Sequence, residues 1–226
     1  MKKTFALIIA FVVILTCFAG CKKGSFEGGV VATNWKGENM AVVTKENGGI
    51  VRNEAGNVII LPTDENGYNI KDDKGEIVTQ AVAIEHAIVI NNRIEMADFA
   101  IEIPKGWADQ KSWKDLIITK EGSTDIITIT PDRTGKKADI EAADSKIIDA
   151  VKLAGGTMEN KTIKVAGVDA SFVAGFAKTS SADVYVAFVV FSYNGVVYNC
   201  RIDANHDLTA SIDEYIAILD TIEFVH

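Results

Sequence analysis

The chain has 226 residues and a formal net charge of −8 at pH 7, from 31 acidic and 23 basic side chains. An acidic protein of this kind does not attract nucleic acid, and its folded part does not adhere broadly to an anionic bilayer. The sequence contains no Gly-x-Ser-x-Gly elbow, no phosphate-binding glycine loop and no zinc-type spacing of His or Cys. We therefore expect a protein that is not an enzyme and has no nucleic-acid partner.

The first residues have the pattern of a bacterial lipoprotein signal peptide. Lys2 and Lys3 precede an apolar run, residues 4–19, which is shorter than the roughly 20 residues that a membrane-spanning helix needs. Cys21 follows directly, and a cysteine after small residues supplies the thiol that receives lipid such as palmitate. The sequence therefore predicts that residues 1–20 are cleaved and that lipidated Cys21 anchors the chain at the outer face of the cell membrane.

Two details leave alternatives to this anchor. Phe18 stands where the usual lipobox carries Leu, and an ordinary signal peptide or an uncleaved anchor would also fit the residues. Cys17 is a second candidate for lipidation, but Thr16 precedes it in place of Ala or Gly. Residues 21–39 continue from the cysteine with Lys22 and Lys23 and contain several glycines, as expected of a flexible tether.

Cys200 would be the one thiol left after cleavage and lipidation, so no intramolecular disulfide is expected. It lies in residues 196–202, where the alternation of side chains places it on the same face as Tyr198 and Ile202. The pattern predicts a buried, unreactive thiol.

Residues 40–85 contain a short recurring pattern in which glycine follows polar and acidic residues and β-branched residues flank each unit. The glycines are Gly48, Gly56, Gly67 and Gly75. Glycine accepts the positive φ of tight turns, so the pattern predicts β-hairpins. It resembles the Val-Thr-x-Glu-x-Gly repeats that lie between anchor and domain in many surface proteins of Gram-positive bacteria, which implies a stalk. The alternative is a small β-meander packed on the next part.

Residues 86–226 have the patterning of one globular unit. Strands are predicted over residues 99–103, 116–119, 126–130, 162–165, 170–176, 184–192 and 196–202, and helices over residues 139–153 and 212–221. Asn194 and Gly195 form a hairpin signal between the last two strands, and Ser211 and Glu214 have capping-box spacing. The element order predicts an α+β fold in which helices flank an antiparallel β-sheet.

The first of these helices should pack on the sheet through one apolar stripe. The residues of this stripe are Ile140, Ala143, Ile147, Ile148 and Val151. Gly155 and Gly156 follow the helix and should end it.

The globular unit resembles PsbP-like domains. The residues that carry the resemblance are Phe99, Ile101, Ile103, Pro104, Gly106 and Trp107, the helix before Gly155 and Gly156, the hairpin strand with Gly195 and Tyr198, and residues 218–224. The resemblance implies an α-β-α sandwich around an antiparallel sheet. It also implies an accessory or partner-binding protein, since none of the shared motifs is catalytic.

The segment before the last helix has the oxygen spacing of an EF-hand-like calcium loop. The donors would be Asp203, Asn205, Asp207, Ser211 and Glu214. Against calcium, Leu208 stands where such a loop needs glycine, and a strand precedes the segment in place of a helix. Glu214 also has a second explanation as a capping-box residue. No other cofactor is predicted.

Trp107 and Trp113 flank a loop at a strand end and are the candidate ligand or partner surface. The alternative is that they seal the edge of the sheet, because large aromatic rings gain most from core contacts. From these features we expect a lipid-anchored surface protein that contacts the membrane through its anchor and uses a PsbP-like domain for protein interaction or envelope assembly. A small-ligand or calcium-binding lipoprotein is the second hypothesis.

Overall fold

The computed structural model describes residues 29–110 and 115–225. The predicted signal peptide, Cys21 and Trp113 lie outside these residues. The strands are β1 (Val30–Asn34), β2 (Asn39–Val42), β3 (Val58–Leu61), β4 (Gln80–Val82), β5 (Ile88–Ile90), β6 (Arg93–Glu95), β7 (Phe99–Glu102), β8 (Trp107–Asp109), β9 (Leu116–Lys120), β10 (Ile126–Asp132), β11 (Thr157–Val165), β12 (Val168–Lys178), β13 (Asp183–Tyr193), β14 (Val196–Ala204) and β15 (Glu223–Phe224). The helices are α1 (Lys137–Leu153) and α2 (Ile212–Leu219).

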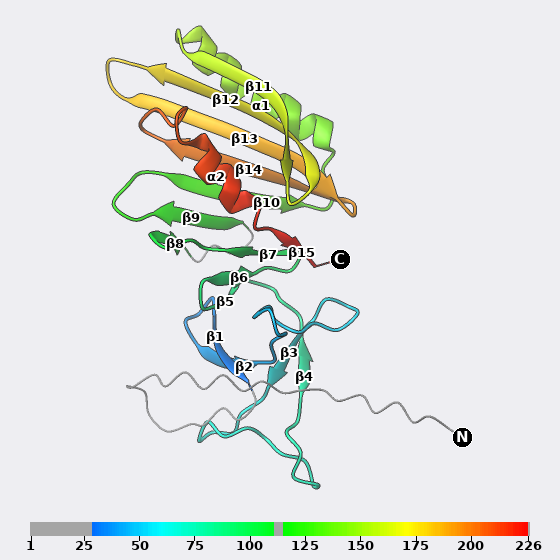
Figure 1. The fold of residues 1–226 in the computed structure, drawn as a ribbon. Helices are drawn as coiled ribbons and strands as arrows, with labels where there is room; N and C mark the ends of the chain where they lie inside the picture. The colour runs from blue at the N-terminus through cyan, green and yellow to red at the C-terminus, as the bar shows by residue number, and fades with distance from the viewer. Residues whose placement is uncertain (1–28, 111–114, 226) are drawn as a thin grey trace, which may run out of the picture.

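The strands form two antiparallel sheets. The order is β15-β7-β6-β5-β1-β2-β3-β4 in the eight-stranded sheet and β11-β12-β13-β14-β10-β9-β8 in the seven-stranded sheet. In Figure 1 the seven-stranded sheet lies above, and the strands of the other sheet continue below it. The expected combination of antiparallel sheet and helices is confirmed. The eight-stranded sheet contains strands from both sides of residue 85, because β1 pairs with β5 as well as with β2.

The recurring glycine units form tight turns. Gly48, Gly56, Gly67 and Gly75 all have φ near +80°, the left-handed region that favours glycine. The turns are closed by side chains as well: Asp64 Oδ1, for example, accepts hydrogen bonds from the backbone N–H groups two and four residues later. Isolated antiparallel bridges lie on either side of these turns. The units therefore have hairpin-like turns with very short ladders.

Three of these units hydrogen-bond to one another in a closed ring. The Val51 N–H donates to the Val43 carbonyl, the Ile59 N–H to Val51, and the Val43 N–H back to Ile59, with N···O distances of 2.8 to 3.0 Å. Side chains of these units, among them Ile50 and Val58, form a small apolar cluster with side chains of β5. The next units make the same kind of contact, in which the Ile70 N–H donates to the Pro62 carbonyl. Because proline has no backbone N–H, Pro62 cannot donate the hydrogen bond that would close a second ring.

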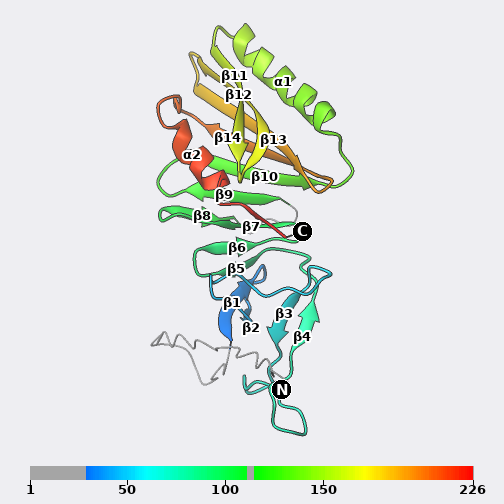
Figure 2. The ribbon, with the colours of Figure 1, turned by 45° about the vertical axis from the view of Figure 1, so that its right-hand side comes forward.

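The two helices cover opposite faces of the seven-stranded sheet (Figure 2). Along β13 alternate side chains point to opposite faces. Val186 and Phe188 pack with Ile148 and Val151 of α1. The odd-numbered residues of β13, such as Phe191, point into the main core with α2 and with side chains of β6 and β7. That core therefore joins the two sheets.

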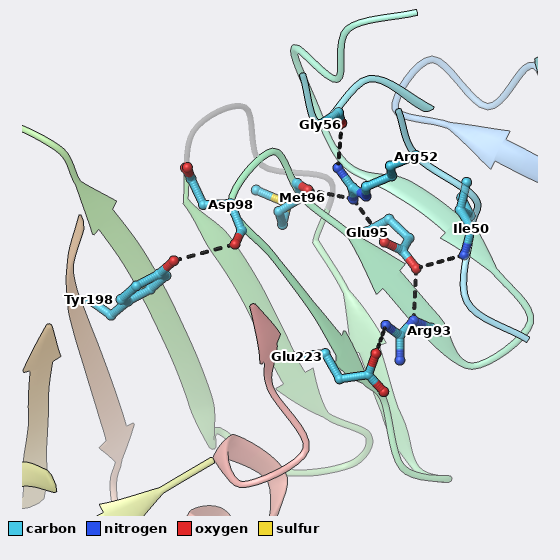
Figure 3. A network of polar contacts seen from close by, with 9 residues as sticks. All are labelled: Ile50, Arg52, Gly56, Arg93, Glu95, Met96, Asp98, Tyr198 and Glu223. Atoms are coloured by element: carbon cyan, nitrogen blue, oxygen red, sulfur yellow. Dashed lines mark hydrogen bonds and ion pairs between the residues drawn. The ribbon is translucent and has the colours of Figure 1, made fainter. Parts of the chain in front are cut away.

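A buried ion-pair network fixes the glycine units to the rest of the protein (Figure 3). Glu95 of β6 is 2% exposed and accepts hydrogen bonds from Arg52 and Arg93, each at 2.8 Å. Arg52 also donates to the Met96 carbonyl, and Arg93 reaches Glu223 of β15 at 2.7 Å. Burial alone would raise the pKa of Glu95, but the two arginines outweigh it and lower the pKa.

The predicted stripe of α1 is partly wrong. Ile148 and Val151 are buried as expected, whereas Ala143 and Ile147 are exposed. The third buried position is Asp144, one turn before Ile148. The helix is rotated so that a carboxylate, rather than the apolar pair, faces the sheet.

Candidate binding site

A cavity of about 260 Å³ lies between α1 and strands β11, β12 and β13. Its lining is mostly polar and includes Glu141, Asp144 and Ser145 from the helix, Asn160 from β11 and Ser171 from β12. Because α1 and the strands approach from different parts of the chain, these residues meet only in the folded protein. Mixed polar and apolar cavities of this kind are candidate ligand sites.

Asp144 is carried into the cavity by the face that anchors α1. Residues three and four apart share a helix face, so Asp144, Ile148 and Val151 point the same way. Ile148 and Val151 pack against Val186 and Phe188 and leave the helix little freedom to turn. The carboxylate is therefore held against the sheet by apolar contacts one and two turns further along the helix.

The carboxylate of Asp144 is buried without a full set of partners. Asp144 is 5% exposed, and Asn199 Nδ2 donates a hydrogen bond to Asp144 Oδ1 at 3.4 Å. Asp144 Oδ2 and Asn199 Oδ1 are both buried and have no hydrogen-bond partner among the described residues. Burial raises the pKa of Asp144, and Asn199 and Arg201 oppose this shift. The site is therefore rich in acceptors and short of a donor.

Other charged side chains near the cavity are already engaged. The Ser171 hydroxyl donates to Glu141 Oε1 in a very short contact, and Lys137 Nζ lies 3.6 Å from the same oxygen. The guanidinium group of Arg201 forms a bidentate contact with the carboxylate of Asp203, with N···O distances of 2.6 to 3.0 Å. Hydrogen bonds to Asp203 raise the pKa of Arg201, so it stays charged.

Beyond the edge of α1 the same face of the sheet continues over β14, β10, β9 and β8. Thr128 of β10 lies directly between Ile117 of β9 and Arg201 of β14. The next row places Ile126 beside Thr119. The side chains of these β9 and β10 residues are half-buried, and Arg201 is exposed. We call Ile117, Thr119, Ile126 and Thr128 the open sheet face.

The structure does not gather the predicted calcium donors around one point. Asp203 binds Arg201, Asn205 shares a 2.6 Å hydrogen bond with Thr124, and Asp207 accepts from the N–H and hydroxyl of Thr209. Within residues 29–110 and 115–225, no group of three or more His, Cys, Asp and Glu side chains is placed to hold a metal ion.

Leu208 explains why this segment does not form an EF-hand-like loop. It is 1% exposed and belongs to the main core, so the segment is tied inward at the position where a calcium loop needs a sharp turn. Helix α2 begins after Ser211 as predicted, but the capping-box bonds are not formed: Ser211 makes no side-chain cap bond, and Glu214 instead pairs with Lys120 at 3.0 Å. The calcium hypothesis therefore gains no support from these contacts.

Trp107 is part of the core and does not form an exposed ligand or partner surface. It is 7% exposed, and its ring meets Tyr215 of α2 edge-on at 5.6 Å between centroids. Lys120 Nζ lies within 6 Å of both rings. Of the two interpretations of Trp107, the packing against the sheet edge agrees with these contacts. Its predicted companion Trp113 lies outside the described residues.

Cys200 is fully buried in the main core, as its alternation predicts. Desolvation strongly raises the pKa of its thiol, which therefore stays protonated.

Asp125, the residue before β10, is also buried. Tyr215 donates to its Oδ2 at 2.5 Å, and His206 Nδ1 lies 3.5 Å from its Oδ1. Its buried position was not foreseen from the sequence.

Comparison with known proteins yields partial likenesses of fold. No family model matches the sequence, and no curated protein matches it. A solved structure from Bacteroides thetaiotaomicron matches with a TM-score of 0.42 and 12% identity over 57% of this chain and 45% of its own chain. This chain thus spans less than half of that protein.

Two further solved structures match over a similar share of the chain. LpqN, which is involved in cell envelope biogenesis of Mycobacterium tuberculosis, has a TM-score of 0.40 and 15% identity over 56% of this chain and 82% of its own. Cyanobacterial PsbP (CyanoP) from Synechocystis has a TM-score of 0.36 and 9% identity over 56% of this chain and 86% of its own. A PsbP protein is thus among the matches. At these scores and identities the matches assign neither a family nor a function.

Neither helix in the described part of the chain is both long and apolar enough to span a bilayer. The site residues that sequence reasoning missed are Asp144 and Asn199. The signal that could have found Asp144 is the stripe of Asp144, Ile148 and Val151, in which an acidic residue shares a helix face with two apolar ones. Asn199 carries no such signal, because its contact with Asp144 depends on how α1 lies across the sheet.

Proposed function

We propose that this chain is a lipid-anchored envelope accessory protein that acts by binding a protein partner and catalyses no reaction. In this proposal residues 1–20 are a signal peptide, lipidated Cys21 holds the chain at the outer face of the membrane, and residues 40–85 support a PsbP-like binding domain. The observation that carries the proposal is the open sheet face beside α1, formed by Ile117, Thr119, Ile126 and Thr128.

The chemistry of this face suits a protein partner. One face of a sheet in a layered domain is normally covered by another layer, and α1 covers only the β11 to β13 half of this one. The open sheet face is made of half-buried β-branched side chains, which lose little rotamer freedom when they are covered. Arg201 at its border adds a planar donor group of the kind enriched in interfaces.

The buried network around Glu95 agrees with the proposal that residues 40–85 hold the binding domain in place. Arg52 is bound to the carboxylate of Glu95 and to the Met96 carbonyl, so this part of the chain is fixed to β6. A support that is fixed in this way would hold the open sheet face at a constant orientation relative to residues 40–85. A loosely linked stalk would not.

Crosslinking followed by pull-down of the anchored protein from intact cells tests the proposal. Thr128→Arg places a bulky charge at the centre of the open sheet face and should abolish recovery of the partner that the unmodified protein brings down. Thr33→Arg is the matched control, because Thr33 is also a half-buried threonine on a strand but belongs to the eight-stranded sheet. It should leave recovery unchanged.

Two outcomes would count against the protein-binding function. One is recovery of the same species with Thr128→Arg as with the unmodified protein. The other is the absence of any specific species despite good expression. Thr119→Arg on the same face provides a second test if Thr128→Arg fails to fold, and the melting temperature of each variant shows whether its fold is intact.

A second candidate function is small-ligand binding, and the cavity beneath α1 favours it. A buried carboxylate oxygen without a partner is unfavourable in an empty site and becomes favourable when a ligand supplies a donor. The two functions concern different surfaces: the ligand would contact Asp144, whereas the protein partner would contact the open sheet face.

A further inference from the structure

We infer that the cavity beneath α1 is a binding site for a primary ammonium group carried on a short apolar stem. This inference rests on the small-ligand function proposed above and does not depend on the open sheet face. The ammonium group would be held by Asp144 and Ser145, which line the cavity, and by Asn199, which contacts Asp144 from β14. Val173 and Val190 of the lining would contact the stem.

The need for a hydrogen-bond donor follows from the two unpartnered oxygens. Asp144 Oδ2 and Asn199 Oδ1 are acceptors, and neither has a partner among the described residues. The two side chains already meet through the 3.4 Å contact between Asn199 Nδ2 and Asp144 Oδ1. A single group with several donors can therefore serve both oxygens, and a positive charge on that group would compensate the buried carboxylate.

Among cations, an ammonium group fits this set better than a metal ion. Calcium takes six to eight oxygen ligands, and the described residues hold no group of three or more His, Cys, Asp and Glu side chains placed for a metal. An ammonium group has three donors and needs only three acceptors. The cavity residues Asp144 and Ser145 supply two of these acceptors, Asp144 Oδ2 and the Ser145 hydroxyl. Asn199 Oδ1, on the side chain that contacts Asp144, supplies the third.

A guanidinium group fits less well for a geometric reason. Guanidinium groups bind carboxylates best through two parallel hydrogen bonds to both oxygens. Asp144 has one oxygen already engaged by Asn199, so only Oδ2 is open. The protein's own guanidinium nearby, that of Arg201, is held by Asp203 rather than by Asp144.

The apolar wall determines what is attached to the ammonium group. Val190 of β13 lies directly opposite Asn199 of β14 and points to the same face, so an apolar surface adjoins the acceptors. Val173 of β12 lines the cavity as well. A volume of about 260 Å³ accommodates a few methylene groups. The chemistry is that of a free alkylamine or of a lysine side chain from a partner protein.

Calorimetric titration of the full chain with n-butylamine tests this site directly. The amine is used at up to about 10 mM, because ligands with so few atoms bind weakly. We expect saturable binding that weakens at least about tenfold in Asp144→Asn. Asp149→Asn is the matched control, since Asp149 is an exposed aspartate on the same helix. It should bind butylamine as the unmodified protein does.

Two further probes define the ligand and keep the test decisive. Butyrate, which has a similar stem and the opposite charge, should not bind. Nα-acetyl-lysine methylamide should bind comparably or better if the natural ligand is a lysine side chain, and more weakly than butylamine if it is a free amine. Asn199→Leu removes the second acceptor and should weaken butylamine binding if Asp144→Asn proves unstable.

The inference is overturned if neither amine binds the unmodified protein, or if Asp144→Asn binds butylamine as tightly as Asp149→Asn does. Saturable binding of butyrate alone would show that the cavity binds ligands but that an ammonium group is the wrong class. In that case the small-ligand function would stand and this inference would fall. The protein-binding function is unaffected by either result, because its test concerns Thr128 on the open sheet face.

Discussion

Glu95 of β6 and Arg52 of the glycine units form a buried ion pair, with 2.8 Å between Oε2 and the guanidinium nitrogen. The side chains are 2% and 10% exposed. The pair joins segments that are 43 residues apart in the chain and lie on either side of the boundary predicted at residue 85. It therefore couples the stability of residues 40–85 to that of the sheet that carries β6.

Removing the charge of Glu95 should destabilise the protein. Glu95→Gln removes the charge that pairs with Arg52 and leaves Arg93 paired with Glu223 alone, and the loss of one partner from a buried pair costs about 3 kcal/mol. The lowered pKa of Glu95 means that its contribution is present at neutral pH and is lost as the pH falls through that pKa. Urea unfolding at about pH 7 should show the full difference, and the difference should shrink at about pH 3.

The exposed Glu54 provides the control for this prediction. Glu54→Gln should change the free energy of unfolding by less than about 0.5 kcal/mol. An equal effect of the two substitutions, or a Glu95→Gln effect that does not depend on pH, would contradict the assignment of a buried carboxylate to Glu95.

Asp144→Asn should stabilise the ligand-free protein at neutral pH. Burial raises the pKa of Asp144, so the native state favours the protonated group, and this contribution is present below the ordinary Asp pKa and lost as the pH rises through the raised value. The neutral amide avoids that loss. The melting temperature of Asp144→Asn should exceed that of the unmodified protein at about pH 7, and the two should converge at about pH 3.

A lower melting temperature for Asp144→Asn at neutral pH would contradict this account. It would indicate that the carboxylate stabilises the fold through contacts of its own rather than being kept for a ligand. The exposed Asp149 on the same helix again serves as the control, and Asp149→Asn should leave the melting temperature nearly unchanged at both pH values.

Leu208 should matter more to stability than the oxygen donors around it. Leu208→Ala removes a buried side chain of the main core and should lower the free energy of unfolding by about 2–5 kcal/mol. Because the predicted calcium donors have other partners, added calcium should leave the melting temperature of the unmodified protein unchanged. A rise with calcium that disappears in Glu214→Gln would restore the calcium hypothesis.

The Cys200 thiol should be inert in the native protein. In a chain that begins at Lys22 it is the remaining cysteine. Its side chain is fully buried and desolvation raises its pKa, so a thiol reagent should label it only as fast as the protein unfolds. Labelling rates measured with and without urea check this. Rapid labelling in native buffer would show that the β14 region opens locally.

The long strands of the seven-stranded sheet could be predicted because their sequence patterns are local. Strands β12 and β13 contain the predicted runs and extend them by one or two residues at each end, and β14 extends its run by two residues at the C-terminal end. The hairpin at Asn194 and Gly195 lies where the turn residues indicate. By contrast, β8 and β15 are three and two residues long, and they are defined by their pairing with β9 and β7. Such short runs have no periodicity of their own.

The candidate site could not be predicted because it depends on tertiary geometry. The apolar residues of α1 allowed a stripe through Ala143 and Ile147, and nothing local showed that Asp144 would occupy the buried face instead. The meeting of Asp144 with Asn199 requires both the rotation of α1 and the register of β13 with β14. In the same way, Trp107 offered two interpretations until Tyr215 of α2 was placed against it.

The proposed role as a partner-binding protein depends on what contacts the open sheet face in the cell. Site-specific photocrosslinking measures this directly, with a photoreactive amino acid placed at Thr128 and, as the control, at Thr33. We predict a discrete crosslinked species of constant mass from position 128 in intact cells, and none from position 33. Identical crosslinking from the two positions, or no product from position 128 in an expressed and folded protein, would contradict the account.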